Sequence, residues 1–391
     1  MDGEILQLPG RGTTVFLAHR PQSPVTSLVA TYARGFGHDP AHAPGVAHLH
    51  EHLYLATLRT IVTAPMVASA QTHADTMNVS ATVLAGHDGQ LVTALAAVSP
   101  LLAAGRIDDD VRLRECRAID VELSEWFGNP LLVAGHKLAA LATRRHRLAR
   151  FDECRIGGVS AIGAQDLRAH ASRREANHPE RLVIVGPRPA EAWLPLLADA
   201  TGPPRAAPEP GTTEPADGHP GPRTDLAGAD SRVYVGIPLH LDTAENAEAA
   251  HLAAQLLLHA RGPLAEVGNR AGARFRGGSV VPAAGCAVVT GSWIVADARQ
   301  REAIGIAFSQ HRGNAAPALV AAQAAALPQR RSAAVAAPAA LAAAIDAWRS
   351  GYGIDPTATG PPDPDGIDRF LRAGWDRAVL VGANSARNSP F

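Results

Sequence analysis

A stretch rich in proline and glycine near the middle of the chain most constrains its fold. Residues 200–228 read ATGPPRAAPEPGTTEPADGHPGPRTDLAG. This composition does not build a packed core and is typical of an extended linker. The chain of 391 residues is therefore predicted to form two domains, residues 1–199 and residues 229–391, separated by a linker at residues 200–228.

The two halves end alike, which indicates an internal duplication. Residues 181–186 (RLVIVG) and residues 377–382 (RAVLVG) are closely similar, and each follows a helical pattern. Strand-like runs and alanine-rich helical patterns occur in both halves, and alanine favours helices. These patterns predict a helix-rich α/β or α+β protein made of two related halves.

Composition excludes several classes of function. The net charge is -1 and no polybasic run is present, so no nucleic-acid partner is expected. No run of eighteen apolar residues occurs and the N-terminus lacks an apolar signal segment, which predicts a cytoplasmic protein outside the membrane. Three widely spaced cysteines, Cys116, Cys154 and Cys286, favour neither disulfides nor a thiolate zinc site.

The residues that carry chemistry lie in GVAHLHEHLYLAT, residues 45–57. On a helix, His48 and His52 are four residues apart and project from one face, within reach of a single metal ion. Glu51 lies beside them. In order, these residues form H-x-x-E-H, the reverse of the metalloprotease motif H-E-x-x-H. This pattern predicts a zinc site with an adjacent general base.

Other interpretations of the histidines remain open. The overlapping H-x-H pairs around His50 would fit a strand of a barrel hydrolase, because alternate residues of a strand share a face. Val46, Leu49 and Leu53 recur at helical spacing and favour a helix instead. A solvated, histidine-rich helix without a metal is the further alternative. A third ligand is needed to decide between them.

A carboxylate from a second helix is predicted as this third ligand. Glu115 and Glu122 are seven residues apart within the helical pattern of residues 108–127 and share its apolar face. Buried carboxylates need partners. We assign Glu122, 70 residues after His52, as the ligand and Glu115 as a hydrogen-bond partner that orients a ligand histidine. A solvated helix edge is the alternative, and Glu115 or Glu125 could replace Glu122.

Together these motifs resemble the pitrilysin family of zinc metallopeptidases, also called inverzincins. The family shows a glycine and an acidic residue, then G-x-A-H-x-x-E-H, then two glutamates seven residues apart. Residues 35–40 (GFGHDP), residues 45–52, and Glu115 with Glu122 match these elements, although the spacing from His52 to Glu122 is slightly shorter than usual. The chain resembles the half-length type related to the mitochondrial processing peptidase, more strongly in its N-terminal half.

The resemblance implies an architecture and a metal site. It implies two similar α+β domains, each a mixed or antiparallel sheet with helices packed on one face, in a dimer that encloses a peptide chamber. It also implies that His48, His52 and Glu122 bind Zn²⁺ and that Glu51 is the general base. An Asn-Ala pair that holds the substrate backbone on an edge strand corresponds here to His73 and Ala74.

The second half departs from the family pattern. Relatives carry an arginine and a tyrosine seven residues apart, and the matching segment here is GNRAGARF, residues 268–275. Phe275 takes the place of the tyrosine and Gly268 that of the arginine, so Arg270 or Arg274 would have to substitute. We infer that a homologous subunit supplies the missing pair in a heterodimer, with a homodimer as the alternative.

The resulting hypothesis is a zinc metalloendopeptidase that hydrolyses short or unfolded peptides. Half-length bacterial relatives occur in the maturation of peptide natural products, so leader removal from a precursor peptide is one hypothesis for the substrate. A non-catalytic assembly subunit and a metal-dependent hydrolase of small amides are the alternatives from other classes.

Overall fold

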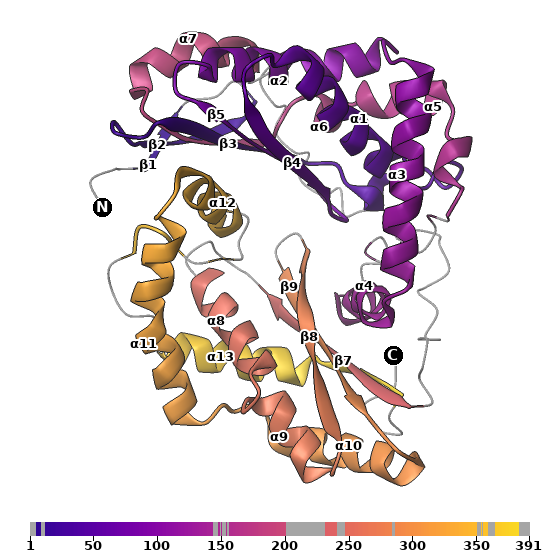
Figure 1. Cartoon of the computed structure of the whole chain (residues 1–391). Helices are drawn as coiled ribbons and strands as arrows, with labels where there is room; N and C mark the ends of the chain where they lie inside the picture. Colours follow the sequence, from indigo (N-terminus) through magenta and orange to yellow (C-terminus); the bar gives the residue numbers. More distant parts are fainter. Residues whose placement is uncertain are drawn as a thin grey trace. The chain divides into compact units, whose positions relative to one another are not determined.

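A computed structural model describes residues 5–8, 12–143, 148, 150, 154, 156–200, 231–240, 247–283, 286–349, 353, 355–358 and 364–382. The chain divides into two compact units (Figure 1). The first unit comprises Met1–Ser124, Arg150–Ala216 and Ala333–Asp346, and the second comprises Glu125–Ala149, Asp217–Ser332 and Ala347–Phe391. The predicted linker lies, from residue 201 onward, outside the described residues.

A six-stranded mixed sheet forms the first unit, with the strand order β1-β2-β6-β3-β5-β4. Its strands are β1 (Ile5–Leu8), β2 (Thr14–His19), β3 (Val25–Tyr32), β4 (Met66–Thr72), β5 (Met77–Leu84) and β6 (Arg181–Gly186). Strands β2 and β6 are parallel, and the other neighbours are antiparallel. Strand β4 is therefore an edge of the sheet.

Helices cover one face of this sheet (Figure 1). They are α1 (Val46–Ile61), α2 (Asp88–Ala103), α5 (Ala164–Ala171), α6 (Arg174–Asn177) and α7 (Ala190–Ala200), with the short 3-10 helices η1 (Phe36–His38) and η3 (Val159–Ala161). Helix α3 (Asp109–Phe127) runs beside α1 rather than over the strands. Tyr54 of α1 contacts both the sheet and helix α2. Its hydroxyl lies 2.7 Å from that of Tyr32 on β3 and donates to the Leu95 carbonyl of α2 at 3.1 Å. Helix α1 is thus anchored to the sheet and to α2.

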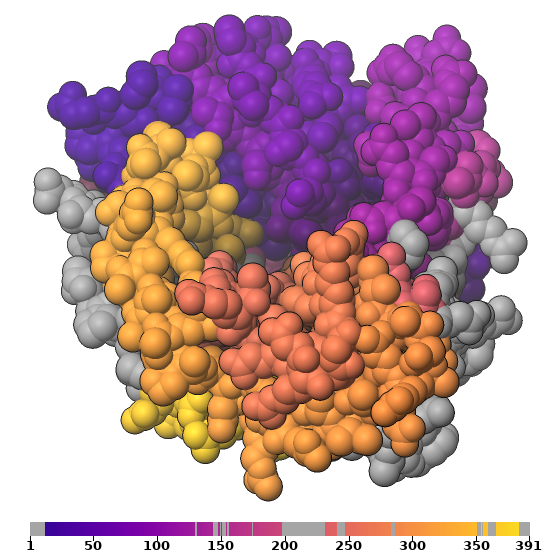
Figure 2. Space-filling model, turned by 60° about the horizontal axis from the view of Figure 1, so that its bottom comes forward, coloured from indigo at the N-terminus to yellow at the C-terminus, as the bar shows by residue number. Residues whose placement is uncertain are grey.

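The other face of the first sheet is covered by a helix from far along the chain. Helix α12 (Pro338–Arg349), gold in Figures 1 and 2, packs against the indigo strands of the first unit. Its Leu341, Ala342 and Ile345 form one apolar cluster with strand residues Phe16, Ala18, Val29, Val183 and Val185. Asp346 at its end accepts hydrogen bonds from Thr31 Oγ1 and Arg181 Nε, each at 2.7 Å.

The second unit contains a four-stranded antiparallel sheet, ordered β10-β7-β9-β8. Its strands are β7 (Arg232–His240), β8 (Arg274–Ala283), β9 (Cys286–Ile294) and β10 (Val379–Val381). Its core is completed by helices α8 (Ala247–Leu258), α9 (Pro263–Arg270), α10 (Ala298–His311), α11 (Pro317–Ala334) and α13 (Pro364–Asp376). Helix α4 (Pro130–Thr143) lies on the opposite face, where Leu138 packs with Tyr234.

The close approach of α4 favours glycine in the sheet beneath it. A Cβ atom at Gly236 would come 3.1 Å from the Leu138 carbonyl oxygen and 3.2 Å from its Cβ. Helix α4 comes from the first half of the sequence, while α12 comes from the second. The compact units therefore differ from the two contiguous halves predicted from the linker. Helix α4 of the first half packs on the second sheet, and helix α12 of the second half packs on the first sheet.

Both units combine a sheet with packed helices, which confirms the predicted α+β class with two similar domains. The first sheet is mixed and the second is antiparallel, as the resemblance implied. The resemblance implied helices on one face of each sheet, whereas each sheet here also carries one helix on its other face, α12 in the first unit and α4 in the second. None of the helices in the described ranges is long and apolar enough to cross a bilayer.

A half-buried histidine of α8 makes the second unit sensitive to acid. His251 Nε2 lies 2.9 Å from Gln255 Nε2, and Arg330 donates to Oε1 of the same amide. The Gln255 amide nitrogen therefore faces His251, which is held as a neutral acceptor. Burial, with a smaller effect from Arg330, lowers the pKa of His251 to about 4.

The folded pKa of His251 lies below its ordinary value of 6.5, so its stabilising effect is present above pH 6.5 and is lost as the pH falls toward 4. We expect His251→Leu to reduce the loss of unfolding free energy over this range by up to about 3 kcal/mol. Urea unfolding of the full chain at pH 6.5 and at pH 4, monitored by tryptophan fluorescence, measures this loss of unfolding free energy. The exposed His87→Leu is the control, and equal losses in wild type and His251→Leu would contradict the prediction.

Candidate metal centre

Helix α1 carries the predicted histidines, and Asp39 fixes its N-terminus. The buried Asp39 carboxylate accepts hydrogen bonds from the backbone N–H groups of Gly45 at 2.7 Å and Ala47 at 3.1 Å. It thereby satisfies two donors that a helix start leaves unpaired. Gly45 has φ +94°, a conformation that favours glycine, and turns the chain into the helix. Burial raises the pKa of Asp39 to about 7, although these hydrogen bonds oppose the shift.

The structure brings His48, His52 and Glu122 together. Glu122 Oε2 lies 3.2 Å from His48 Nε2 and 3.5 Å from His52 Nε2. One donor atom from each residue lies within 4.8 Å of the others. The two imidazoles are largely buried, whereas Glu122 is 54% exposed. The hydrogen bond from His48, followed by the charges of the histidines, lowers the pKa of Glu122, so the carboxylate form is favoured.

These donors fit a tetrahedral zinc ion. Zinc bonds of 2.0–2.2 Å to nitrogen and oxygen place neighbouring ligand atoms about 3.3–3.5 Å apart in a tetrahedron. The two distances from Glu122 to the histidines lie close to this edge length. Two imidazole nitrogens and one carboxylate oxygen also form a donor set that catalytic zinc sites use, with a fourth position left for water or substrate.

Glu115 lies against the second histidine, as predicted. Its Oε2 is 3.3 Å from His52 Nδ1, while its Oε1 accepts hydrogen bonds from Arg114 at 3.2 Å. If Nδ1 carries the proton, the hydrogen bond to Glu115 leaves the Nε2 lone pair free for a metal. Glu115 is thus placed to orient His52. Glu125, the other alternative for the third ligand, is exposed and lies outside the group formed by His48, His52 and Glu122.

Glu51 is buried beside the histidines and held by a residue the sequence patterns did not indicate. Thr72 Oγ1, at the end of β4, donates a 2.6 Å hydrogen bond to Glu51 Oε2. Glu51 follows His48 by three positions, so the two side chains are neighbours on the surface of α1. Nothing in the sequence around Thr72 marks this contact, because it joins a helix to a strand that the patterns did not predict.

His50 lies on a different side of α1 from the metal-binding histidines. It is fully buried, and its ring centroid is 5.0 Å from that of His170. Burial lowers the pKa of His50 to about 4, so the ring is neutral. Because His48, His50 and His52 belong to a helix, the alternative H-x-H arrangement on a strand is wrong.

The backbone of His73 and Ala74 is already used within the first unit. The His73 carbonyl accepts from the Phe36 N–H at 3.0 Å, and the Ala74 carbonyl accepts from the Gly37 N–H at 2.8 Å. The His73 N–H donates to the Thr76 carbonyl at 2.7 Å. A substrate-binding role for this pair, which stays a prediction, would therefore rest on the His73 imidazole or the Ala74 N–H.

The structure gives Phe275 a packing contact. Its ring centroid lies 5.8 Å from that of Trp293, at the edge of the core of the second unit. Arg270 is exposed in the last turn of α9. Gly268, which takes the place of the usual arginine, has no room for a side chain: an added Cβ would lie 2.8 Å from the Ala273 carbonyl oxygen and 2.9 Å from the Trp293 ring.

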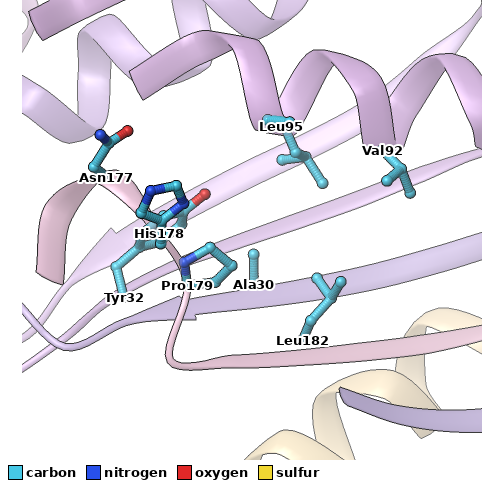
Figure 3. Close-up of a pocket in the computed structure, with 9 residues that line it drawn as sticks. Ala30, Tyr32, Val92, Leu95, Asn177, His178, Pro179 and Leu182 are labelled. Atoms are coloured by element: carbon cyan, nitrogen blue, oxygen red, sulfur yellow. The ribbon is translucent and has the colours of Figure 1, made fainter. Parts of the chain in front are cut away.

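A gap beneath α2 has no room for a substrate. It measures about 10 Å³ and lies between Val92 and Leu95 of α2 and Ala30 and Leu182 of the sheet (Figure 3). A single water needs roughly 10–15 Å³ of this kind of volume. The gap is a packing defect in the core of the first unit.

No known family model matches the sequence, and no curated protein matches it. Several solved structures do. Pitrilysin has a TM-score of 0.67 and 16% identity, covering 97% of this chain and 44% of its own, so the chain spans less than half of that protein. A protease from Helicobacter pylori has a TM-score of 0.64 and 12% identity, covering 97% of this chain and 98% of its own.

An inactive peptidase M16 domain from Pseudomonas fluorescens has a TM-score of 0.68 and 15% identity, covering 97% of each chain. The chain therefore has the fold of pitrilysin and the M16 peptidases. At these identities the likeness establishes the fold alone. The inactive domain among these structures shows that the fold does not require catalysis.

The contact between η1 and His73 can be tested at Gly35. An added Cβ at Gly35 would lie 1.9 Å from the His73 carbonyl oxygen. At this point the backbone N–H groups of Phe36 and Gly37 bind the loop between β4 and β5. We expect Gly35→Ala to lower the unfolding free energy by about 1–3 kcal/mol, the usual cost of overpacking. Urea unfolding measures it.

Gly89→Ala is the matched control for this variant. An added Cβ at Gly89 would meet Leu196 at an ordinary 3.7 Å, in the first turn of α2. This control should be neutral or slightly stabilising, because alanine favours helices. Equal stability of Gly35→Ala and Gly89→Ala would contradict the close approach of Gly35 to the His73 carbonyl oxygen.

Proposed function

We propose that this chain is the zinc-binding subunit of a peptidase that hydrolyses peptide bonds in short or unfolded peptides. The observation that carries the proposal is the convergence of His48, His52 and Glu122 at distances that suit zinc. The buried Glu51 on the same helix, held by Thr72, supplies a base beside this group. The M16 fold supports a peptidase in general.

The chemistry follows from the residues around the site. A bound zinc ion would supply a Lewis acid that polarises the scissile carbonyl and acidifies a water molecule. Glu51 takes one proton from the attacking water and passes it to the departing amine nitrogen as the C–N bond breaks. The hydroxyl group of the water bonds to the carbonyl carbon, so the products are one peptide with a new carboxylic acid end and one with a new amine end. Thr72 keeps the Glu51 carboxylate in position throughout.

Edge strand β4 is the proposed substrate-pairing edge. It is bonded to β5 on one side and ends the six-stranded sheet on the other. A peptide added along the open edge would form main-chain hydrogen bonds that do not depend on its side chains. The strand ends at Thr72, whose hydroxyl holds Glu51, so a paired peptide would be led to the general base.

A homologous subunit is proposed as the partner. The positions where relatives carry an arginine and a tyrosine hold Gly268, with no space for a side chain, and Phe275, which packs on Trp293. A second chain that carries both residues would complete the site. A homodimer without them is the alternative, and co-purification with any co-encoded relative distinguishes the two.

A non-catalytic subunit is the second candidate function. The inactive M16 domain from Pseudomonas fluorescens favours it, because that domain matches this chain along 97% of its length. Against it stands the full set of three donors with an adjacent buried carboxylate, which an assembly role does not need. The two candidates differ in whether the loaded chain hydrolyses peptides.

Substitution of Glu51 separates metal binding from chemistry. Glu51→Gln should keep about one zinc per chain and lower peptide hydrolysis by about 10²-fold or more, because the general base is lost. Glu122→Gln should lower zinc occupancy, since one of three protein ligands is weakened. Metal analysis and cleavage of a fluorogenic peptide, with the chain alone and with its partner, measure both effects.

Glu125→Gln is the control, because Glu125 is an exposed residue of the same helix outside the donor group. Loss of zinc in Glu51→Gln would show that Glu51 is structural. Full zinc occupancy in Glu122→Gln would move the third ligand elsewhere. Full occupancy in wild type with no hydrolysis in any preparation would favour the non-catalytic subunit.

Glu115 should act through His52. Glu115→Ala removes the 3.3 Å contact with His52 Nδ1, and loss of such a contact weakens zinc affinity by about 10–100-fold. At saturating zinc the variant should still bind about one ion, which distinguishes it from Glu122→Gln. Competition with a chelator of known affinity measures the change. Unaltered affinity would show that Glu115 does not orient the ligand.

A further inference from the structure

The second unit contains a pocket whose lining shares no residue with the candidate metal site. It measures about 230 Å³ and lies between the first turn of α4 and strands β8 and β9. Its lining combines the half-buried Leu131 and Leu132 with one cationic side chain, Arg276, and the hydroxyl residues Ser279 and Thr290. It is large enough for a small ligand and far too small for a folded partner.

A β-bulge presents Arg276 to this pocket. Phe275 pairs with Trp293 and Gly278 with Gly291, so Arg276 and Gly277 together oppose the single residue Ser292. Such bulges redirect a side chain and occur often beside functional sites. Gly277 has φ +85°, and a Cβ at Gly278 would lie 1.7 Å from the Thr290 carbonyl oxygen, so glycine is required at both positions.

Arg276 has no acidic partner. Its side chain is exposed, and no hydrogen bond or ion pair links it to any of the described residues. The directly opposed Ser292 is fully buried and is not part of the pocket lining, so its hydroxyl takes no part in binding there. The uncompensated positive charge of Arg276 favours a ligand that carries an anion.

The other polar groups limit how the anion can be bound. Thr290 Oγ1 donates to the Ser279 carbonyl at 3.2 Å, and the two hydroxyl oxygens are 3.1 Å apart. The Ser279 hydroxyl therefore donates its own proton to Thr290 Oγ1, and neither hydroxyl has a proton left for a ligand. Helix α4 offers no donor, because Leu131 N–H is bonded to Asn129 Oδ1 and Leu132 N–H to the Asn129 carbonyl, each at 3.1 Å. The charged donor of the pocket is thus the Arg276 guanidinium, and the side-chain amide nitrogen of Asn129, also in the lining, is a neutral donor.

We propose that this pocket binds the C-terminal carboxylate of a peptide whose last residue is apolar. One guanidinium neutralises one negative charge, and its planar fork matches the two oxygens of a carboxylate. No second cationic residue lines the pocket to balance a phosphate dianion. Leu131 and Leu132 form an apolar wall for the terminal side chain.

The proposal deepens the proposed function, since it rests on that function for the peptide nature of the ligand. The binding itself needs no metal. It can therefore be measured with the chain treated with a chelator, in which failure of the zinc site or of hydrolysis has no effect on the result.

Isothermal titration of the full-length, chelator-treated chain tests the pocket with three probes: the dipeptide Ala-Leu, its C-terminal amide, and inorganic phosphate. The acid should bind at least about tenfold more tightly than the amide, because only the carboxylate forms charge-assisted hydrogen bonds with Arg276. Arg276→Gln should weaken binding of the acid by about tenfold or more and leave the amide unchanged. Arg299→Gln, an exposed arginine of α10, is the control.

A longer peptide ending in Ala-Leu should bind at least as tightly as the dipeptide if polypeptide ends are the ligand, whereas binding of the dipeptide alone would overturn the assignment to polypeptide ends. Equal affinity for acid and amide, or unchanged affinity in Arg276→Gln, would overturn the proposal. So would phosphate binding as tight as that of the dipeptide. Circular dichroism of Arg276→Gln establishes that the variant is folded.

Discussion

The candidate site depends on the register between helices α1 and α3. Glu122 reaches both histidines only because α3 presents the right face to α1, and a shift of one residue along α3 would turn that carboxylate by about 100°. The buried residues Cys116, Ile119 and Leu123 fix this face against the first unit. Asp120 adds a hydrogen bond from the Gly157 N–H at 2.7 Å. Packing of α3 thus determines whether the three donors meet.

The two sheets share a second constraint, which is that each has two faces to cover. In the first unit Val183 and Val185 point away from the helices α1 and α2, and α12 covers them. In the second unit α4 covers Tyr234 from the opposite side to α8 and α9. Because each covering helix comes from the other half of the sequence, neither half contains all the residues that its own sheet needs. Each unit is therefore assembled from both halves of the sequence.

Strands β4 and β8 show why sequence patterns fail at the edges of a sheet. Strand β4 reads MVASAQT, with exposed and half-buried positions alternating, and β8 contains two consecutive glycines and a bulge. Edge strands bury little surface, so they do not need the run of β-branched residues that marks a central strand such as β6. Strands β4 and β8, neither of which was predicted, carry proposed binding functions: β4 ends at the residue that holds Glu51, and β8 presents Arg276.

The sequence alone determined the parts of the site that lie within one helix. The spacing of His48, Glu51 and His52 is set by the period of α1, and that of Glu115 and Glu122 by the period of α3, so the sequence alone determines which of them are neighbours on one helix. The α+β class and the paired halves followed from periodicity and duplication for the same reason. Tertiary structure alone decided the contacts of Thr72, the capping role of Asp39, the exchange of α4 and α12, and the pocket at Arg276. These contacts join residues that are distant in sequence or lie on irregular backbone, where no repeating pattern of side chains records which partner will be met.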